Sequence, residues 1–167
     1  IKSYRIGGII FFERNIPSPK ALPEQIVNFK ESVDYPLFFM IDQEGGKVNR
    51  LKKEFPIFAG NKFYGDKKDF QGAEEAYRVT ARELKKIGIN VNLAPVVDVA
   101  REESSYIAER SFGTDPKLVS QFVKLAIEAI HAEGVFACAK HFPGIGNLKQ
   151  DPHEVLPVNS QPANEFR

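Results

Sequence analysis

The stretch "VFACAKH", residues 135–141, decides the fold, because an apolar, strand-like run ends there in a lysine and a histidine. Gly134 directly precedes it and ends a helix that we predict over residues 115–133. That helix has Thr114 as a possible N-cap, Pro116 in its first turn, and apolar residues four apart, which are Leu118, Phe122, Ala126 and Ile130. A helix that leads at once into a buried strand is typical of a βαβ unit.

The same alternation of strand and helix runs through the preceding part of the chain. Apolar runs without polar alternation fit strands that are covered on both faces, and they occur at residues 6–12, 37–41 and 89–99. Helices are predicted over residues 23–33 and 73–88, the second ending at a glycine. Four strands that alternate with three helices indicate an α/β fold with a parallel sheet.

Polar residues at the strand ends distinguish between two such architectures. Asp42 follows the second strand, Asp98 and later Arg110 follow the third, and Lys140 and His141 follow the fourth. In a (β/α)8 TIM barrel the loops at the carboxyl ends of several strands jointly build one site. A doubly wound open sheet instead concentrates its polar groups at one switch point. We therefore predict part of a (β/α)8 TIM barrel.

The length of the chain limits how much of that barrel it contains. A TIM barrel needs roughly 250 residues, and this chain has 167. We expect residues 1–167 to form about half of a catalytic barrel domain, beginning and ending inside it. Residues 157–167 read as a turn followed by the start of another helix.

Composition and charge exclude several classes of partner. Lys and Arg total 23 against 22 for Asp and Glu, so there is no electrostatic case for nucleic acid or an anionic membrane surface. No uncharged stretch approaches the about 18 apolar residues of a membrane span. The single cysteine, Cys138, forms no internal disulfide. We expect a cytoplasmic monomer without a cofactor, and export stays open.

The stretch "DQEGGKVNRL", residues 42–51, is the first candidate for chemistry. The Asp42 carboxylate can accept hydrogen bonds from ligand hydroxyls, and Arg50 offers a planar fork of donors. A solvated loop with a surface ion pair is the alternative. The spacing of glycines in phosphate-binding loops is absent. Arg110, in "ERSFGTDP", is by itself equally compatible with a structural or solvated arginine.

The stretch "KHFPGIGNLKQDPH", residues 140–153, is a stronger candidate for chemistry than residues 42–51. Asp151 and His153 are close enough for the carboxylate to hold one imidazole nitrogen, which would give an acid/base catalyst that works near neutral pH. A helix-capping aspartate beside an unrelated surface histidine is one alternative. A metal site from His141, Asp151 and His153 is another, although Lys140 would repel the cation.

These motifs together resemble the glycoside hydrolase family 3 β-N-acetylhexosaminidases. The resemblance covers essentially the whole chain and rests on "GGIIFFERNI", "DQEGGKVNRL", "NVNLAPVVDV", "ERSFGTDP" and "KHFPGIGNLKQDPH". In that family the segment K-H-F-P-G-x-G followed by D-x-H separates N-acetylglucosaminidases from β-glucosidases. The resemblance implies a retaining exo-β-N-acetylglucosaminidase that releases terminal N-acetylglucosamine from peptidoglycan and muropeptide fragments.

The resemblance also implies a role for each candidate residue. His153 would be the general acid/base, held by Asp151. The family's nucleophilic aspartate would lie beyond Arg167. The sugar pocket would use Asp42 for the hydroxyls and would be completed by Arg50, Arg110, Lys140 and His141. A sugar-binding barrel without catalysis and a metal-dependent hydrolase remain alternatives, and phosphorolysis in place of hydrolysis stays open.

Overall fold

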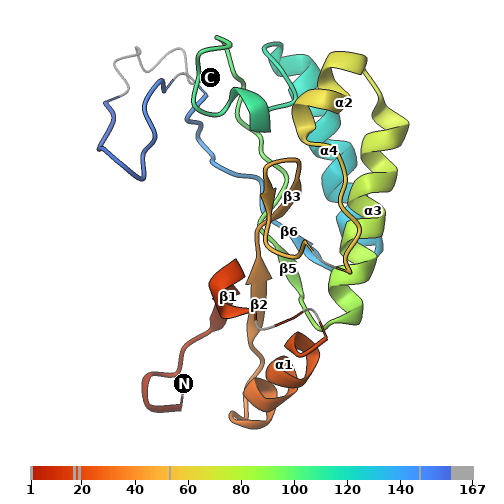
Figure 1. The fold of residues 1–167 in the computed structure, drawn as a ribbon, viewed down its shortest axis with the longest axis vertical. Helices are drawn as coiled ribbons and strands as arrows, with labels where there is room; N and C mark the ends of the chain where they lie inside the picture. The colour runs from red at the N-terminus through yellow and green to blue at the C-terminus, as the bar shows by residue number, and fades with distance from the viewer. Residues whose placement is uncertain (1, 17, 19, 53, 147, 159–167) are drawn as a thin grey trace.

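The computed structural model describes residues 2–16, 18, 20–52, 54–146 and 148–158, and shows a parallel sheet with helices along one side (Figure 1). The sheet order is β1 (Gly8–Phe11), β2 (Phe38–Ile41), β5 (Val91–Asn92) and β6 (Phe136–Ala137). Each strand pairs in parallel with the next of this order. Neighbouring strands therefore follow the chain order without a switch point, as expected for part of a barrel.

Three of the four α-helices of the described residues lie where the sequence predicts helices. The α-helices are α1 (Leu22–Glu31), α2 (Asn61–Lys67), α3 (Phe70–Lys86) and α4 (Pro116–Ala132), and of these α2 was not predicted. Short 3₁₀ helices are η1 (Lys2–Tyr4), η2 (Glu13–Asn15) and η3 (Ala108–Arg110). A hairpin that the sequence did not predict, β3 (Gln43–Gly45) with β4 (Val48–Asn49), directly follows β2. No helix in the described part of the chain is long and apolar enough to cross a membrane.

Two predicted details differ from the structure, and a third cannot be compared with it. The N-cap of α4 is Asp115 and not Thr114, because the Asp115 carboxylate accepts a hydrogen bond from the Lys117 amide. The strand predicted over residues 89–99 is a regular strand only over β5, and its pairing resumes beyond Pro95, where Val96 forms an isolated bridge with Lys140. The helix start predicted within residues 157–167 falls largely on residues 159–167, which lie outside the described residues.

Only one face of the sheet is covered by helices. Phe39 and Ile41 of β2 are fully buried against that layer, and α3 packs against α4 through a core that includes Phe112 and Phe122. The opposite face carries Phe38 and Phe136, which meet edge to face with ring centroids 6.1 Å apart and are about half exposed. The prediction of cover is met on the helix-covered face, and for the second face it stays a prediction, because the chain contains only part of the barrel. A barrel keeps its interior side chains on this second face.

Candidate functional site

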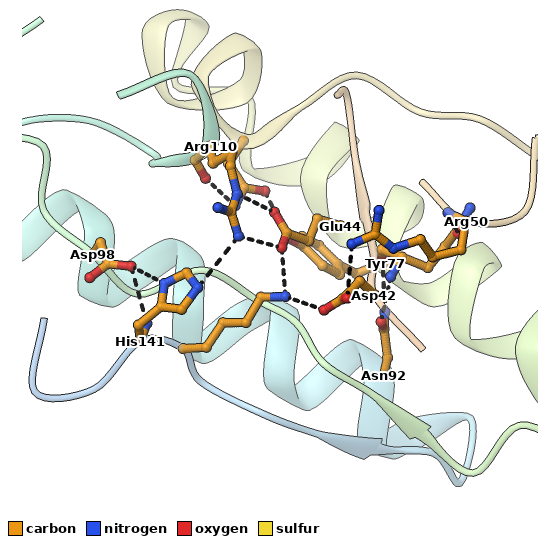
Figure 2. Close-up of polar contacts among 11 residues, drawn as sticks. Asp42, Glu44, Arg50, Tyr77, Asn92, Asp98, Arg110 and His141 are labelled. Carbon is orange, nitrogen blue, oxygen red and sulfur yellow. Dashed lines mark hydrogen bonds and ion pairs between the residues drawn. The ribbon is translucent and has the colours of Figure 1, made fainter. Parts of the chain in front are cut away.

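Five of the predicted site residues, those expected to bind substrate, come together near the carboxyl ends of β2, β5 and β6 (Figure 2). Asp42 follows β2 directly, and Lys140 pairs with Val96 in a parallel bridge beyond β5. The Val97 amide donates to the Lys140 carbonyl over 2.6 Å, which extends the ladder as far as this lysine. Because parallel strands end at the same edge of a sheet, side chains far apart in sequence meet here.

A buried carboxylate, Glu44, lies at the centre of the site. Lys140 Nζ lies 2.6 Å from Glu44 Oε1 and 2.6 Å from Asp42 Oδ1. Arg110 donates to both oxygens of Glu44, from Nη2 over 2.8 Å and from Nε over 2.9 Å. The Glu44 side chain is 3% exposed. One inaccessible carboxylate therefore holds two cations at fixed positions, and Arg50 completes the row by donating to Asp42 Oδ2 over 3.1 Å.

These ion pairs change the acidity of the groups that form them. Burial by itself raises the pKa of Asp42, but the hydrogen bonds and charges of Lys140 and Arg50 outweigh it and leave the pKa below its ordinary value. For Arg110, burial lowers the pKa, and the paired Glu44 carboxylate more than offsets this, so the pKa is raised. Asp42 and Arg110 are therefore held in their charged forms.

His141 is held by a second buried carboxylate, that of Asp98. Asp98 Oδ2 lies 2.7 Å from His141 Nδ1 and accepts from the His141 backbone amide over 3.1 Å. Asp98 Oδ1 accepts from the Ile145 amide over 2.6 Å. Burial raises the pKa of Asp98, but the hydrogen bonds from His141 and Ile145 outweigh burial, and the pKa lies below its ordinary value. The other ring nitrogen of His141, Nε2, lies 3.5 Å from Arg110 Nη2.

Side chains from neighbouring elements hold the hairpin that carries Glu44. Asn92, in β5, exchanges hydrogen bonds of 3.1 and 3.0 Å with the backbone of Gln43. The Gln43 side chain in turn accepts from the amides of Arg50 and Leu51. Gln43 and Asn92 are both buried, so these bonds replace lost hydration and fix the hairpin beside the strand ends.

Arg110 is positioned through its backbone as well as its side chain. The Tyr77 hydroxyl, on α3, donates to Asn61 over 2.7 Å, and Asn61 donates to the Arg110 carbonyl over 2.9 Å. Burial is the main cause of a raised pKa at Tyr77, so this hydroxyl keeps its proton. Helices α2 and α3 thereby fix the position of the Arg110 backbone.

Exposure divides the site into two sets of side chains. Glu44 and Asp98 are inaccessible, with 3% and 0% of their side chains exposed. The accessible set keeps between 14% and 33% of each side chain exposed and consists of Asp42, Arg50, Arg110, Lys140 and His141. A carboxylate acceptor beside ammonium, guanidinium and imidazole groups can bind several hydroxyls of one ligand at once. The structure therefore places together all five residues that we predicted for substrate binding, with Arg110 among them.

Two central residues, Glu44 and Asp98, received no role in the sequence analysis. Glu44 lies two residues after Asp42 at a strand end, and period-two alternation places such residues on the same side. The two-residue spacing from Asp42 could therefore have identified Glu44 from the sequence. Asp98 was noted at a strand end, but nothing in the sequence showed that its partner is 43 residues away.

The predicted contact between Asp151 and His153 is present, but it lies away from the ionic site. His153 Nδ1 lies 2.8 Å from Asp151 Oδ1, and the His153 amide donates to the same oxygen. That amide is the main cause of a lowered pKa at Asp151. The His153 side chain is 79% exposed, on a segment that stands out from the body in deep blue (Figure 1). Among the described residues, Asp151 is its only side-chain partner.

The three residues considered for a metal site are not brought together. His141 contacts Asp98, whereas His153 contacts Asp151 on the outlying segment. Within the described ranges, no group of three or more His, Cys, Asp or Glu side chains has the arrangement of a metal site. The geometry thus gives His141 a polar-ligand or structural role.

Fold and side chains together define part of a (β/α)8 barrel with a cluster of charged and polar side chains near the carboxyl ends of its strands. The family model described as the glycosyl hydrolase family 3 N terminal domain matches residues 1–167. The chain therefore belongs to this family, and both the resemblance and the barrel predicted from the sequence are confirmed.

Named relatives agree with this family. A beta-hexosaminidase of Nitrosomonas eutropha is 32% identical over 93% of this chain and 47% of its own length. A family 3 β-N-acetylglucosaminidase structure from Paenibacillus is 34% identical with a TM-score of 0.91, over 96% of this chain and 32% of that one. NagZ from Neisseria gonorrhoeae, in complex with N-trifluoroacetyl-D-glucosamine, is 30% identical with a TM-score of 0.86, over 96% of this chain and 49% of its own. The chain spans about half the length of the curated relatives it matches.

Proposed function

We propose that the complete protein is a retaining exo-β-N-acetylglucosaminidase that releases terminal N-acetylglucosamine from peptidoglycan and muropeptide fragments. The observation that carries the proposal is the group of five accessible polar side chains, which two buried carboxylates, Glu44 and Asp98, help to hold. The similarity to a NagZ bound to an N-acylated glucosamine favours a sugar of this type. The activity is proposed for the complete protein, because the chain spans about half of its relatives.

Sugar binding follows from the chemistry of these side chains. Asp42 accepts hydrogen bonds from sugar hydroxyls, while Lys140 and Arg50 donate to the hydroxyl oxygens. Hydrogen bonds to charged groups contribute about 1.5–3 kcal/mol each. Glu44 and Asp98 fix the cations and the imidazole before the ligand arrives, so little of that energy is lost in ordering side chains.

His153 supplies the acid/base step in this proposal. Asp151 occupies one imidazole nitrogen and leaves the other free to protonate the leaving oxygen. A neutral imidazole adds no second negative charge beside the nucleophile, the aspartate that we expect beyond Arg167. Retaining glycosidases form a covalent glycosyl-enzyme that water then hydrolyses. The outlying segment has to move for His153 to reach the sugar.

Hydrogen bonds in the structure indicate the residue at which the moving part of this segment would begin. Ser105 Oγ donates to the Gly146 carbonyl over 2.7 Å, and the Tyr106 amide donates to the Leu148 carbonyl over 2.9 Å. These bonds hold the loop as far as Leu148. Closure is therefore expected to rotate only the residues that follow Leu148, which include the Asp151–His153 pair.

The direct test is hydrolysis of 4-nitrophenyl N-acetyl-β-glucosaminide by the full-length protein. His153→Ala should lose about 10²–10⁴ in rate, and least with activated leaving groups, because these need little protonation. His131→Ala, on the exposed side of α4, is the matched control. Equal rates for wild type and His153→Ala would remove His153 from the mechanism. Ligand binding without turnover by the wild type would favour the sugar-binding barrel.

The peptidoglycan substrate and the cytoplasmic location are further parts of this proposal. Comparison of kcat/KM for muropeptides with that for chitooligosaccharides tests the first, and a higher value for chitooligosaccharides would overturn it. Cell fractionation tests the second. A single cysteine, Cys138, agrees with either compartment, because no disulfide within the chain is needed for folding.

A further inference from the structure

We infer that Asp98 is a positioning residue, which holds His141 with its ring proton on Nδ1 and also fastens the base of the loop that carries His153. Nε2 of His141 is then offered to the ligand as a hydrogen-bond acceptor. The inference deepens the proposed sugar-binding role of His141. Only its kinetic test depends on that role.

The first step is the chemistry of the contact with Nδ1. Asp98 Oδ2 lies 2.7 Å from His141 Nδ1, and the Asp98 side chain has no exposed surface. An ionised carboxylate only accepts hydrogen bonds, so Nδ1 has to carry the proton. The lowered pKa of Asp98 agrees with the ionised form. A neutral imidazole with its proton on Nδ1 has a free lone pair on Nε2.

The surroundings of Nε2 lead to the same assignment. Arg110 Nη2 lies 3.5 Å from Nε2, and a guanidinium group only donates. The His141 side chain is 33% exposed, so a ligand can reach the ring. Asp98 on one side and Arg110 on the other thus specify the same tautomer. The accessible site then holds an imidazole acceptor beside cationic donors, so a hydroxyl that contacts His141 is recognised as a donor.

The second step concerns the loop. The other oxygen of Asp98 accepts from the Ile145 amide over 2.6 Å. The next residue, Gly146, packs so closely on the Val99 carbonyl that a Cβ would lie 1.8 Å from its oxygen. Asp98 and Val99 therefore hold the start of the loop against the segment that follows β5. The same carboxylate joins the sugar-contacting imidazole to the fixed base of the segment that carries His153.

The test uses full-length protein with ¹⁵N-labelled histidine, at a pH where imidazole is neutral. The His141 signal is assigned by its loss in His141→Gln. We expect wild type to be protonated on Nδ1 and unprotonated on Nε2. A wild-type His141 protonated on Nε2 would overturn the inference, and this measurement needs neither substrate nor activity.

Asp98→Asn keeps the side-chain volume but leaves only one acceptor oxygen. In wild type, His141 bonds to one oxygen of Asp98 and the Ile145 amide donates to the other, so the single oxygen of asparagine cannot serve both. Either the His141 tautomer or the hydrogen-exchange protection of the Ile145 amide must therefore change. If both stay as in wild type, Asp98 does not have this role. Ser105→Ala removes the bonds to the loop at Gly146 without touching His141, so it should keep the wild-type tautomer. A tautomer change in Ser105→Ala would indicate general loosening and also overturn the inference.

The kinetic measurement separates this inference from the proposed function. If the wild type hydrolyses 4-nitrophenyl N-acetyl-β-glucosaminide, Asp98→Asn should raise KM about tenfold, the effect of roughly one lost hydrogen bond. Ser105→Ala should raise KM less. An unchanged KM in Asp98→Asn would contradict the inference. A wild type without hydrolysis would instead count against the proposed function, while the tautomer measurement would still decide the role of Asp98.

Discussion

Replacing Glu44 by glutamine tests whether one buried carboxylate organises the site. The substitution keeps the shape of the side chain but removes the charge that faces Lys140 and Arg110. Loss of one partner from a buried ion pair costs about 3–5 kcal/mol, because the remaining charge is left uncompensated. The glutamine oxygen still accepts one of the hydrogen bonds, and Lys140 keeps Asp42 as a partner. We therefore expect Glu44→Gln to lower the free energy of unfolding by about 3 kcal/mol, the lower end of that range.

The matched control is an ion pair of the same chemistry on the surface. Glu13 and Lys52 lie 2.8 Å apart, and more than half of each side chain is exposed. Glu13→Gln should cost less than about 1 kcal/mol, because water already solvates both charges. Urea unfolding of the full-length protein measures both variants through the midpoint and the slope.

The substrate assay gives a second readout for Glu44. Glu44 itself is too buried to touch a sugar, so KM should rise only because Lys140 and Arg110 lose their fixed positions. A loss of stability as small as that of Glu13→Gln, together with an unchanged KM, would refute the claim that Glu44 organises the site.

Two further predictions concern single residues, and a third concerns the product of the reaction. The pKa of Asp42 is lowered in the folded protein, so its carboxylate stabilises the fold above about pH 4 and loses this contribution as the pH falls through the folded value. In Asp42→Asn, the free energy of unfolding measured with urea should therefore fall less steeply at acid pH than in wild type. An equally steep fall would contradict this. Gly146→Ala should cost about 1–3 kcal/mol in urea unfolding, because its Cβ would meet the Val99 carbonyl, whereas Gly7→Ala meets nothing within 4 Å and should be neutral. In phosphate buffer, mass spectrometry should find free N-acetylglucosamine, and a sugar phosphate would identify a phosphorylase.

The sequence was sufficient for the four strands of the parallel sheet, for the helices α1, α3 and α4, and for the accessible part of the site, but not for α2 or the β3–β4 hairpin. Helix α4 was readable because its proline, its four-residue apolar spacing and Gly134 are all local signals. Asp42, Lys140 and His141 were readable because each directly follows an apolar strand, and parallel strands end at one edge. The N-cap at Thr114 was wrong because two neighbouring residues could cap and the backbone conformation chose Asp115.

Only the tertiary structure decided which charges meet. Lys140 and Asp42 are separated by 98 residues, Glu44 and Arg110 by 66, and Asp98 and His141 by 43. Local patterns specify that a carboxylate stands at a strand end, but its partner depends on the strand order and on how the loops pack. Close backbone approaches such as that of Gly146 to Val99 set those loop paths. Hydrophobic periodicity is a property of neighbours along the chain, whereas an ion pair is a property of neighbours in space.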